Sequence, residues 1–242
     1  MRMYGELAEW FHLLSPPQEY AEEAADYASF LLDACPDATT LLELGSGGGN
    51  TASYLKRRFA CTLTDLSPEM LAMSIGINPE CEHVQSDMRT MRLGQRFDAV
   101  FVHDAIVYML TRADLGAAIE TAYVHTRVGG VALFVPDCVR ETFVASTDHG
   151  GHDDLHGRGV RYVEWVHEPA PDATTYVVDY ALLLRESDGE VRTVHDRHTE
   201  GLFSRTEWRT ILKEAGFEVS EPELNPLIHE EQVAFVCRRP PT

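Results

Sequence analysis

A glycine-rich turn and a carboxylate follow two apolar runs, and together they could bind a nucleoside. The turn spans Gly45–Gly49 after the run TLLEL at 40–44, and Asp65 ends the run CTLTD at 61–65. Glycines let a backbone turn sharply and approach a ligand where any Cβ would collide. A carboxylate at the end of the next strand can accept hydrogen bonds from both ribose hydroxyls. We therefore predict a buried parallel strand, a ligand-binding turn and a ribose-binding carboxylate.

The residues around the turn help to distinguish a dinucleotide from a nucleoside ligand that carries a positive charge. The dinucleotide fingerprint has glycine at its first, third and sixth positions, so that a pyrophosphate can sit on the following helix. Counting from Gly45, the sixth position is Asn50. Glu43, two residues before the turn, would repel a pyrophosphate and attract an ammonium or sulfonium group. The pattern favours the cationic ligand, with a dinucleotide-dependent oxidoreductase as an alternative, and it predicts a helix over 50–58.

Four segments, in order and spacing, resemble the class I S-adenosylmethionine-dependent methyltransferases. They are ELGSGGG at 43–49, DLSPEM at 65–70, SDM at 86–88 and FDAVFVH at 97–103. The resemblance implies an enzyme with S-adenosyl-L-methionine as cofactor. It also implies cofactor contacts from Tyr20, Glu43, Gly45, Ser46, Gly47, Gly49, Asn50, Asp65, Leu66, Met70, Asp87, Met88 and His103.

Each expected cofactor contact has a chemical reason. Asp65 would accept from the ribose, Asp87 from the adenine amino group, and Glu43 would meet the ammonium of the methionine moiety. An aromatic residue from the N-terminal helices, Tyr20 or Tyr4, would close over the cofactor, although each could instead be a packing residue. Asp65 could instead cap a helix, and Asp87 could instead be only a turn residue.

The sequence indicates fewer residues for the methyl acceptor than for the cofactor. A hydroxyl acceptor needs a base within reach, and histidine titrates near neutral pH. His103 and Asp104 follow the fourth strand, so we predict that they are the catalytic residues; the alternative is that His103 only closes the strand end. Tyr108 could orient the acceptor or simply pack in the core.

A histidine-rich segment at 148–156 has the sequence DHGGHDDLH. Its spacing matches no zinc framework, so we predict no metal there and interpret the segment as a mobile lid over the acceptor. The predicted acceptor contacts are Tyr108, His149, His152 and Arg161. The following segments resemble small-molecule methyltransferases, including amino-sugar N-methyltransferases of natural-product pathways, whose nucleotide-sugar acceptors are anionic. Arg140 and Arg158 could also serve such an acceptor, whereas the acidity of the chain argues equally for a neutral or cationic amine.

Hydrophobic patterning predicts an α/β fold, and the resemblance implies that it is doubly wound, with a seven-stranded mixed sheet whose last strand is antiparallel. We expect one domain over 1–242, with N-terminal helices (1–39), a cofactor-binding core (40–136), a substrate-covering loop and β insertion (137–200) and a C-terminal helix and strand pair (201–242). The core strands are expected at 40–44, 61–64, 83–85, 97–102 and 131–135. The inserted antiparallel ribbon follows strand five and is expected to have about three strands, at 160–166, 174–184 and 190–195. Capping patterns predict helices over 111–125 and 204–216, and the last strands are expected at 217–220 and 232–237.

Composition limits the classes of partner. The 242 residues contain 20 basic and 39 acidic side chains, a formal charge of -19, which disfavours binding to nucleic acid or an anionic membrane. Five scattered cysteines, without C-x-x-C spacing, predict reduced thiols in a cytoplasmic protein. We expect methyl transfer to a nitrogen or oxygen of a small molecule, and a homodimer is one option for the assembly. A protein that binds the cofactor without transferring its methyl group is the main alternative.

Overall fold

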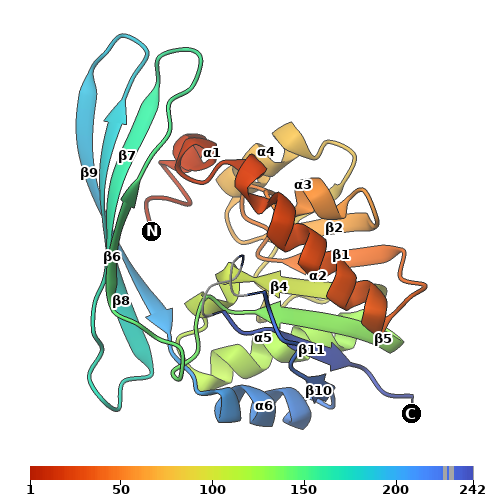
Figure 1. Ribbon diagram of the computed structural model, residues 1–242. Coiled ribbons are helices and arrows are strands. Elements are labelled where there is room, and N and C mark those ends of the chain that lie inside the picture. The colour runs from red at the N-terminus through yellow and green to blue at the C-terminus, as the bar shows by residue number, and fades with distance from the viewer. Residues whose placement is uncertain (226–227, 229–231, 242) are drawn as a thin grey trace.

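The computed structural model describes residues 1–225, 228 and 232–241. Its larger sheet has seven strands in the order β10-β11-β5-β4-β1-β2-β3 (Figure 1). Strands β1 to β5 run parallel where they pair, and β11 pairs antiparallel with β5, which confirms the predicted mixed sheet. The strands are β1 Thr40–Leu44, β2 Ala60–Asp65, β3 Glu82–Gln85, β4 Phe97–His103, β5 Thr126–Val135, β10 Glu218–Ser220 and β11 Phe235–Arg238.

Helices cover both faces of this sheet, so the residues of its central strands are mainly apolar. On one face, Tyr27 and Leu31 pack against Leu41 and Phe101. On the other face, α5 and α6 pack against the side chains of β4, β5 and β11. The helical elements are η1 Ala8–Trp10, α1 Phe11–Leu14, η2 Pro17–Tyr20, α2 Ala21–Ala34, α3 Ala52–Leu55, α4 Pro68–Ile77, η3 Asp104–Tyr108, α5 Arg112–His125 and α6 Arg205–Glu214.

The predicted capping residues begin their helices as expected. Thr111 accepts a hydrogen bond from the backbone N–H of Asp114 at the start of α5, and Ser204 forms a complete capping box with Glu207 at the start of α6. The helix predicted over 50–58 is shorter than expected. Only Ala52–Leu55 is α-helical, and the chain continues through turns to enter β2 at residue 60.

The inserted ribbon has four antiparallel strands rather than about three, in the order β6-β7-β8-β9. They are β6 Ser146–Gly150, β7 Gly159–Val166, β8 Thr175–Arg185 and β9 Val191–Gly201. The additional strand β6 contains part of the histidine-rich segment, which was expected to be a loop. Its sequence STDHG has no strand composition, and its extended shape comes from pairing with β7.

The N-terminal segment joins the ribbon to the core. Leu7 and Trp10 pack into an apolar cluster with Val160, Leu182 and Leu184 of the ribbon. In Figure 1 the ribbon stands beside the α/β core, and α1 lies between the ribbon and the core. The space that the ribbon encloses with the carboxyl ends of the core strands therefore depends on this segment. No helix among the described residues is long and apolar enough to cross a membrane.

Candidate functional site

The glycine turn lies at the carboxyl end of β1 and is closely packed on one side. Gly45 has a φ of 73°, and a Cβ there would lie 2.3 Å from the Cβ of Ala105 and 2.9 Å from Cε of Met88. Gly47 differs, because its φ of 52° favours glycine while its only near neighbour is Cε of Met70, 3.6 Å from a Cβ position. Gly45 is therefore required by packing, and the open space lies at Gly47, where a ligand can approach the backbone.

Asp65 ties this turn to the end of β2. Its Oδ2 accepts a hydrogen bond of 2.8 Å from the backbone N–H of Gly47, and its Oδ1 accepts one of 2.8 Å from Ser67. Burial raises the pKa of Asp65, and these two backbone donors oppose the rise. The carboxylate has acceptor capacity left for hydroxyl groups. Leu66 beside it is exposed, whereas Met70 is fully buried beneath the turn.

Three buried polar atoms around the turn have no hydrogen-bond partner among the described residues. They are Oε2 of Glu43, Oγ of Ser46 and Oδ1 of Asn50. Burial raises the pKa of Glu43 to about 8, and the nearby His103 offsets only part of this effect. Unsatisfied buried acceptors are costly, so they indicate a missing donor. An ammonium group would satisfy the Glu43 oxygen, and Asp65 has room for ribose hydroxyls, so these residues fit S-adenosylmethionine.

Asp87 is already hydrogen-bonded to a side chain of the protein, which the sequence did not indicate. Its carboxylate accepts hydrogen bonds from Arg89, at 2.6 Å from Nη2 and 3.0 Å from Nε. These contacts lower the pKa of Asp87. Met88 lies against Gly45, at the other end of the same loop. An adenine amino group would therefore share Asp87 with Arg89.

The N-terminal segment covers the glycine turn. The ring of Phe11 lies over Gly48, and Nε2 of His12 is 3.0 Å from the carbonyl oxygen of Gly48. The side-chain amide of Asn50 donates to the carbonyl oxygen of Ser15 at 2.9 Å. Asn50 thus fastens the covering segment, a role that the sequence did not indicate.

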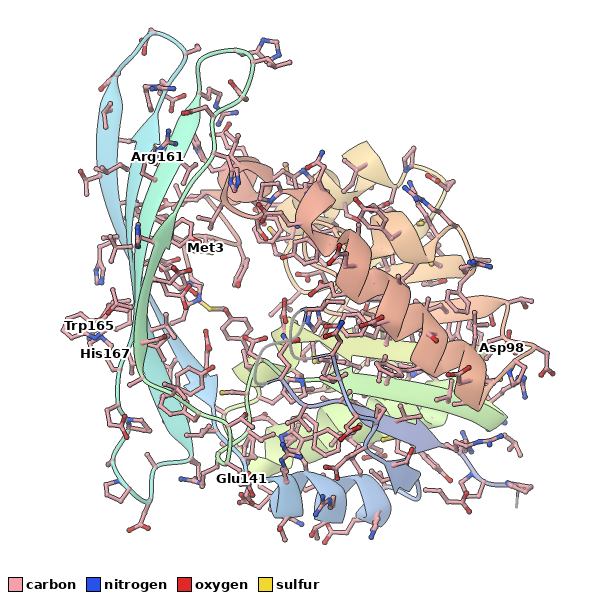
Figure 2. The ribbon with its side chains drawn as sticks, viewed as in Figure 1. Met3, Asp98, Glu141, Arg161, Trp165 and His167 are labelled. Carbon is pink, nitrogen blue, oxygen red and sulfur yellow. The ribbon has the colours of Figure 1, made fainter. Side chains whose placement is uncertain are left out.

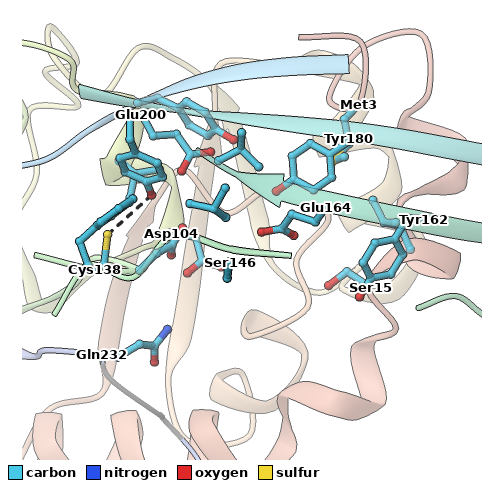
Figure 3. Close-up of a pocket in the computed structure, with 18 of the residues that line it drawn as sticks. Met3, Ser15, Asp104, Cys138, Ser146, Tyr162, Glu164, Tyr180, Glu200 and Gln232 are labelled. Carbon is cyan, nitrogen blue, oxygen red and sulfur yellow. Dashed lines mark hydrogen bonds between the residues drawn. The ribbon is translucent and has the colours of Figure 1, made fainter. Parts of the chain in front are cut away.

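A cavity of about 830 Å³ lies between the ribbon and the carboxyl ends of β4 and β5 (Figure 3). Its described lining includes six tyrosines and five carboxylates and contains no Lys, Arg or His side chain. The tyrosines are Tyr4, Tyr20, Tyr108, Tyr162, Tyr176 and Tyr180. The carboxylates are Glu23, Asp104, Asp137, Glu164 and Glu200.

His103 is buried at the end of β4 and is not among the residues lining this cavity. Its Nε2 lies 2.8 Å from Oδ1 of Asp104 and 3.2 Å from the hydroxyl of Tyr27. Burial alone would lower the pKa of His103, but the Asp104 carboxylate, with Glu23 further away, outweighs burial and raises it to about 9. An imidazolium at neutral pH cannot accept a proton, which argues against His103 as the base.

Asp104 does face the cavity, and about half of its side-chain surface is open to it. Its φ of 33° is the only positive value at a non-glycine residue in the described chain, and such strain is common at functional sites. Asp104 also shares a hydrogen bond with Asp137, just beyond the end of β5. Burial raises the pKa of Asp137, and the adjacent Asp104 raises it further, so Asp137 holds a proton while Asp104 is ionised.

Sequence reasoning missed Glu23, Asp137, Glu164 and Glu200. Burial raises the pKa of Glu23 to about 7, and its Oε1 has no hydrogen-bond partner among the described residues. Two features of the sequence could have identified Glu23 and Glu164 as cavity residues. Glu23 lies one helical turn before Tyr27 on the buried face of α2, and Glu164 alternates with Tyr162 along one face of β7.

Of the predicted acceptor contacts, the structure brings only Tyr108 to the cavity, where its hydroxyl lies 2.9 Å from Nδ1 of His198. His149, His152 and Arg161 are not in the lining. His152 lies 3.1 Å from Glu19, and Arg161 pairs with Asp153 at 2.6 Å.

The alternation of side chains along β7 explains why Arg161 lies outside. Tyr162, Glu164 and Val166 face the cavity, so the residues between them point outward. Figure 2 shows Trp165 on the outer face of the ribbon and Met3 on its inner side. Among the described residues, no three His, Cys, Asp or Glu side chains are placed to hold a metal ion.

Comparisons with known proteins agree with this geometry. A family model described as a methyltransferase domain matches residues 41–130. The chain is 29% identical over 211 residues to dTDP-3-amino-3,4,6-trideoxy-alpha-D-glucopyranose N,N-dimethyltransferase of Streptomyces venezuelae, covering 86% of this chain and 88% of that protein.

Two solved structures are similar over almost the whole chain. The crystal structure of Streptomyces venezuelae DesVI has a TM-score of 0.82 and 26% identity, covering 92% of each chain. The structure of SAM-bound CalS10, an amino pentose methyltransferase from Micromonospora echinaspora, has a TM-score of 0.78 and 27% identity, covering 91% of each chain. Residues 41–130 thus form a methyltransferase domain, and with its glycine turn, strand-end carboxylates and seven-stranded sheet the whole chain is similar to the class I S-adenosylmethionine-dependent methyltransferases, with S-adenosylmethionine as its cofactor.

Proposed function

We propose that this protein methylates an amine nitrogen of an amino sugar held in the cavity beneath the ribbon. The observation that carries this proposal is the ionised Asp104 carboxylate beside Asp137, at the adjacent ends of β4 and β5 and facing that cavity. An ionised carboxylate attracts an ammonium group and offers no such attraction to a neutral hydroxyl group. The Streptomyces venezuelae relative named above, an N,N-dimethyltransferase of a 3-amino sugar, supports the same acceptor atom.

The chemistry needs a positioned free amine. When bound, S-adenosylmethionine supplies a methyl group that its sulfonium already activates. An ammonium has no lone pair, so the acceptor nitrogen must first lose one proton. The protein's tasks are to orient the nitrogen, to take up that proton and to keep water out.

We assign Glu23 as the group that accepts the proton from the acceptor nitrogen. Its pKa of about 7 suits exchange with an amine near neutral pH, and its Oε1 is free of other partners among the described residues. Asp104 and Asp137 hold the amine, and the proton passes from the ammonium to the Glu23 carboxylate, which leaves a lone pair on nitrogen. His103 is a positioning residue, because its imidazolium fixes Asp104.

The cofactor contacts keep the roles predicted from the sequence, with Asp65 at the ribose, Glu43 at the ammonium and Asp87 at the adenine. Tyr20 lines the cavity with its hydroxyl 2.5 Å from Oγ of Ser15, which supports closure over the cofactor. The net charge of -19 supports a protein that binds neither nucleic acid nor membrane. Cytoplasmic location and a homodimer stay predictions.

The test is transfer of a labelled methyl group from S-adenosylmethionine to a panel of amines and hydroxyl compounds. The panel includes free amino sugars, thymidine-diphosphate amino sugars and oligoamines. We expect an N-methylated amino sugar and S-adenosylhomocysteine as products. Transfer only to hydroxyl groups, or binding of the cofactor with no transfer, would contradict the proposal.

Cofactor binding is tested separately by thermal shift. S-adenosylhomocysteine at about 100 times its dissociation constant should stabilise the protein by about 2.7 kcal/mol. Asp65→Ala should abolish this shift. Asp33→Ala, at an exposed position on α2, is the matched control and should retain it.

A further inference from the structure

The charge of the cavity separates two kinds of amino-sugar acceptor. A nucleotide-linked sugar brings a diphosphate, which proteins bind with Arg, Lys or backbone N–H groups at a helix end. The described lining offers five carboxylates and no basic side chain. The short helix α3 begins at the glycine turn and provides no separate phosphate site here.

The arginines that could have served a diphosphate are engaged elsewhere. Nη2 of Arg140 donates to the carbonyl oxygens of Ala173 and Leu202, at 2.7 and 3.3 Å. The guanidinium of Arg158 stacks 3.9 Å from the ring centroid of Trp10 and pairs with a carboxylate at 3.2 Å. Arg161 is held by Asp153 outside the cavity. None of the three lines the cavity.

The carboxylates occupy separate places in the cavity. Glu164 on β7 pairs in register with Tyr180, and Glu200 on β9 pairs with Tyr176. Because Tyr176 and Tyr180 are four residues apart on β8, the two glutamates are separated by roughly 13 Å along that strand. Figure 3 shows Glu164 beside Tyr180 at one side of the cavity and Glu200 with Cys138 towards the other.

No cation among the described residues neutralises Glu164 or Glu200. Glu200 is 5% exposed, and the basic group that the described residues place beside it is His198, 3.9 Å away, whose pKa is lowered by burial. Burial raises the pKa of Glu200 to about 7, and repulsion from Glu164 and Asp104 adds to the rise. Burial also raises the pKa of Glu164. Buried carboxylates that repel one another are stabilised when cations bind between them.

Aromatic rings fill the space between the two glutamates. Tyr4, Tyr108 and Tyr180 surround His198, with ring centroids 5.0 to 5.9 Å from it. Tyrosine faces attract ammonium groups and pack against the apolar faces of sugar rings. A chain of rings that carries several ammonium groups therefore matches the separate carboxylates and the tyrosine rings of this cavity.

From these observations we infer that the acceptor is an oligoamine: an amino sugar joined to at least one further amine-bearing ring, without a diphosphate. The methylated nitrogen lies at Asp104 and Asp137, and the other ammonium groups lie at Glu164 and Glu200. This inference rests on the proposed amine methylation. It differs from the thymidine-diphosphate sugar in the name of the Streptomyces venezuelae relative.

The test is calorimetric binding to the full-length protein saturated with S-adenosylhomocysteine. The probes are neamine, which has two rings and four amino groups, glucosamine, which has one amino group, and thymidine 5′-diphosphate. We expect neamine to bind at least 10-fold more tightly than glucosamine, and thymidine diphosphate to bind more weakly than either. Thymidine diphosphate binding as tightly as neamine would overturn the inference.

Variants locate the second ammonium site. At least one of the variants Glu164→Gln and Glu200→Gln should weaken neamine binding at least 10-fold, and both should change glucosamine binding less than threefold. Glu190→Gln, an exposed ribbon residue outside the cavity, is the matched control and should change neither affinity. A retained thermal shift with S-adenosylhomocysteine shows that each variant is folded. Unchanged neamine affinity in both folded cavity variants would overturn the inference.

Labelled methyl transfer keeps the two proposals distinct. Methylation of a thymidine-diphosphate amino sugar but not of neamine would remove the oligoamine inference and leave amine methylation intact. The absence of transfer to every amine in the panel would remove the proposed function itself, and the inference with it.

Discussion

Glu43 is buried at the end of β1 with one carboxylate oxygen that no described residue satisfies. Burial raises its pKa to about 8 from an ordinary value near 4.5. Because the folded protein holds this proton more tightly than the unfolded chain, Glu43 destabilises the fold increasingly as pH rises from about 4.5 to 8. A residue that weakens the free protein and faces an open ligand site is expected where binding supplies the missing partner.

Glu43→Gln should therefore stabilise the free protein and weaken cofactor binding. Above pH 7 we expect a gain of about 1 kcal/mol or more in the free energy of unfolding, shrinking towards pH 5. The affinity for S-adenosylhomocysteine should fall at least about 10-fold, because the ammonium loses its charged partner. Urea unfolding at several pH values and calorimetry measure the two effects. Glu218→Gln, exposed on β10, should show neither. A destabilised variant with full affinity would refute this role.

Glu23→Gln should lower kcat at pH 7 by about 100-fold, because the ammonium loses its proton acceptor. The pKa of Glu23 is raised to about 7, so the parent rate should rise as pH passes 7 and the carboxylate ionises. The deficit of the variant should shrink at pH 9, where more of the amine is already free. A pH–rate profile checks both points, with the exposed neighbour Glu22→Gln as control. A deficit that stays constant with pH would remove Glu23 as proton acceptor.

At the scale of elements, the N-terminal segment connects the ribbon to the cofactor site. Its Leu7 and Trp10 pack against the ribbon, while Phe11 and His12 cover the glycine turn. The hydroxyl of Ser67 also donates to the backbone of this segment near its start. A change at the cofactor site can therefore reach the ribbon through one short stretch of chain.

Asn50→Ala should loosen this covering segment. It removes the 2.9 Å hydrogen bond to the carbonyl oxygen of Ser15, which contributes about 1 kcal/mol. Without ligand, we expect faster amide hydrogen exchange over residues 4–15, and about fivefold weaker binding of S-adenosylhomocysteine. Ser53→Ala is the control, since its hydroxyl bonds within the same turn and does not contact the segment. Unchanged exchange over 4–15 would show that Asn50 does not fasten it.

At the scale of the whole molecule, the net charge of -19 has the same sign as the charge of the acidic side chains that line the cavity. An overall negative field attracts a multiply charged cation and is screened by salt. Because the field acts mainly on the encounter, it affects substrate capture more than the step after binding.

Raising sodium chloride from about 0.02 to 0.5 M should lower kcat/KM for neamine at least roughly fivefold, while kcat changes little. Glucosamine, with a single charge, should show a smaller decrease in the same assay. Steady-state kinetics over a range of salt concentrations check this prediction. A value of kcat/KM independent of salt would contradict an electrostatic contribution to capture.

The cofactor half of the site could be predicted from sequence because its residues are local. Glu43 and the glycine turn are contiguous, and Asp65 ends the neighbouring parallel strand, so period and spacing determine their positions. The capping residues Thr111 and Ser204 were predictable for the same reason. The sequence by itself thus determined the fold class, the methyl donor and the helix starts.

Tertiary structure decided the acceptor half. Asp104 and Asp137 meet only because β4 and β5 are neighbours in the sheet. Arg161 was a predicted contact and Glu164 was not, yet strand register turns Glu164 inward and Arg161 outward, because neighbouring side chains on a strand face opposite sides. His103 was predicted as a base from its place after β4, and its contact of 2.8 Å with Asp104, which raises its pKa to about 9, argues against that role. These outcomes depend on contacts between segments far apart in the chain, which local pattern does not encode.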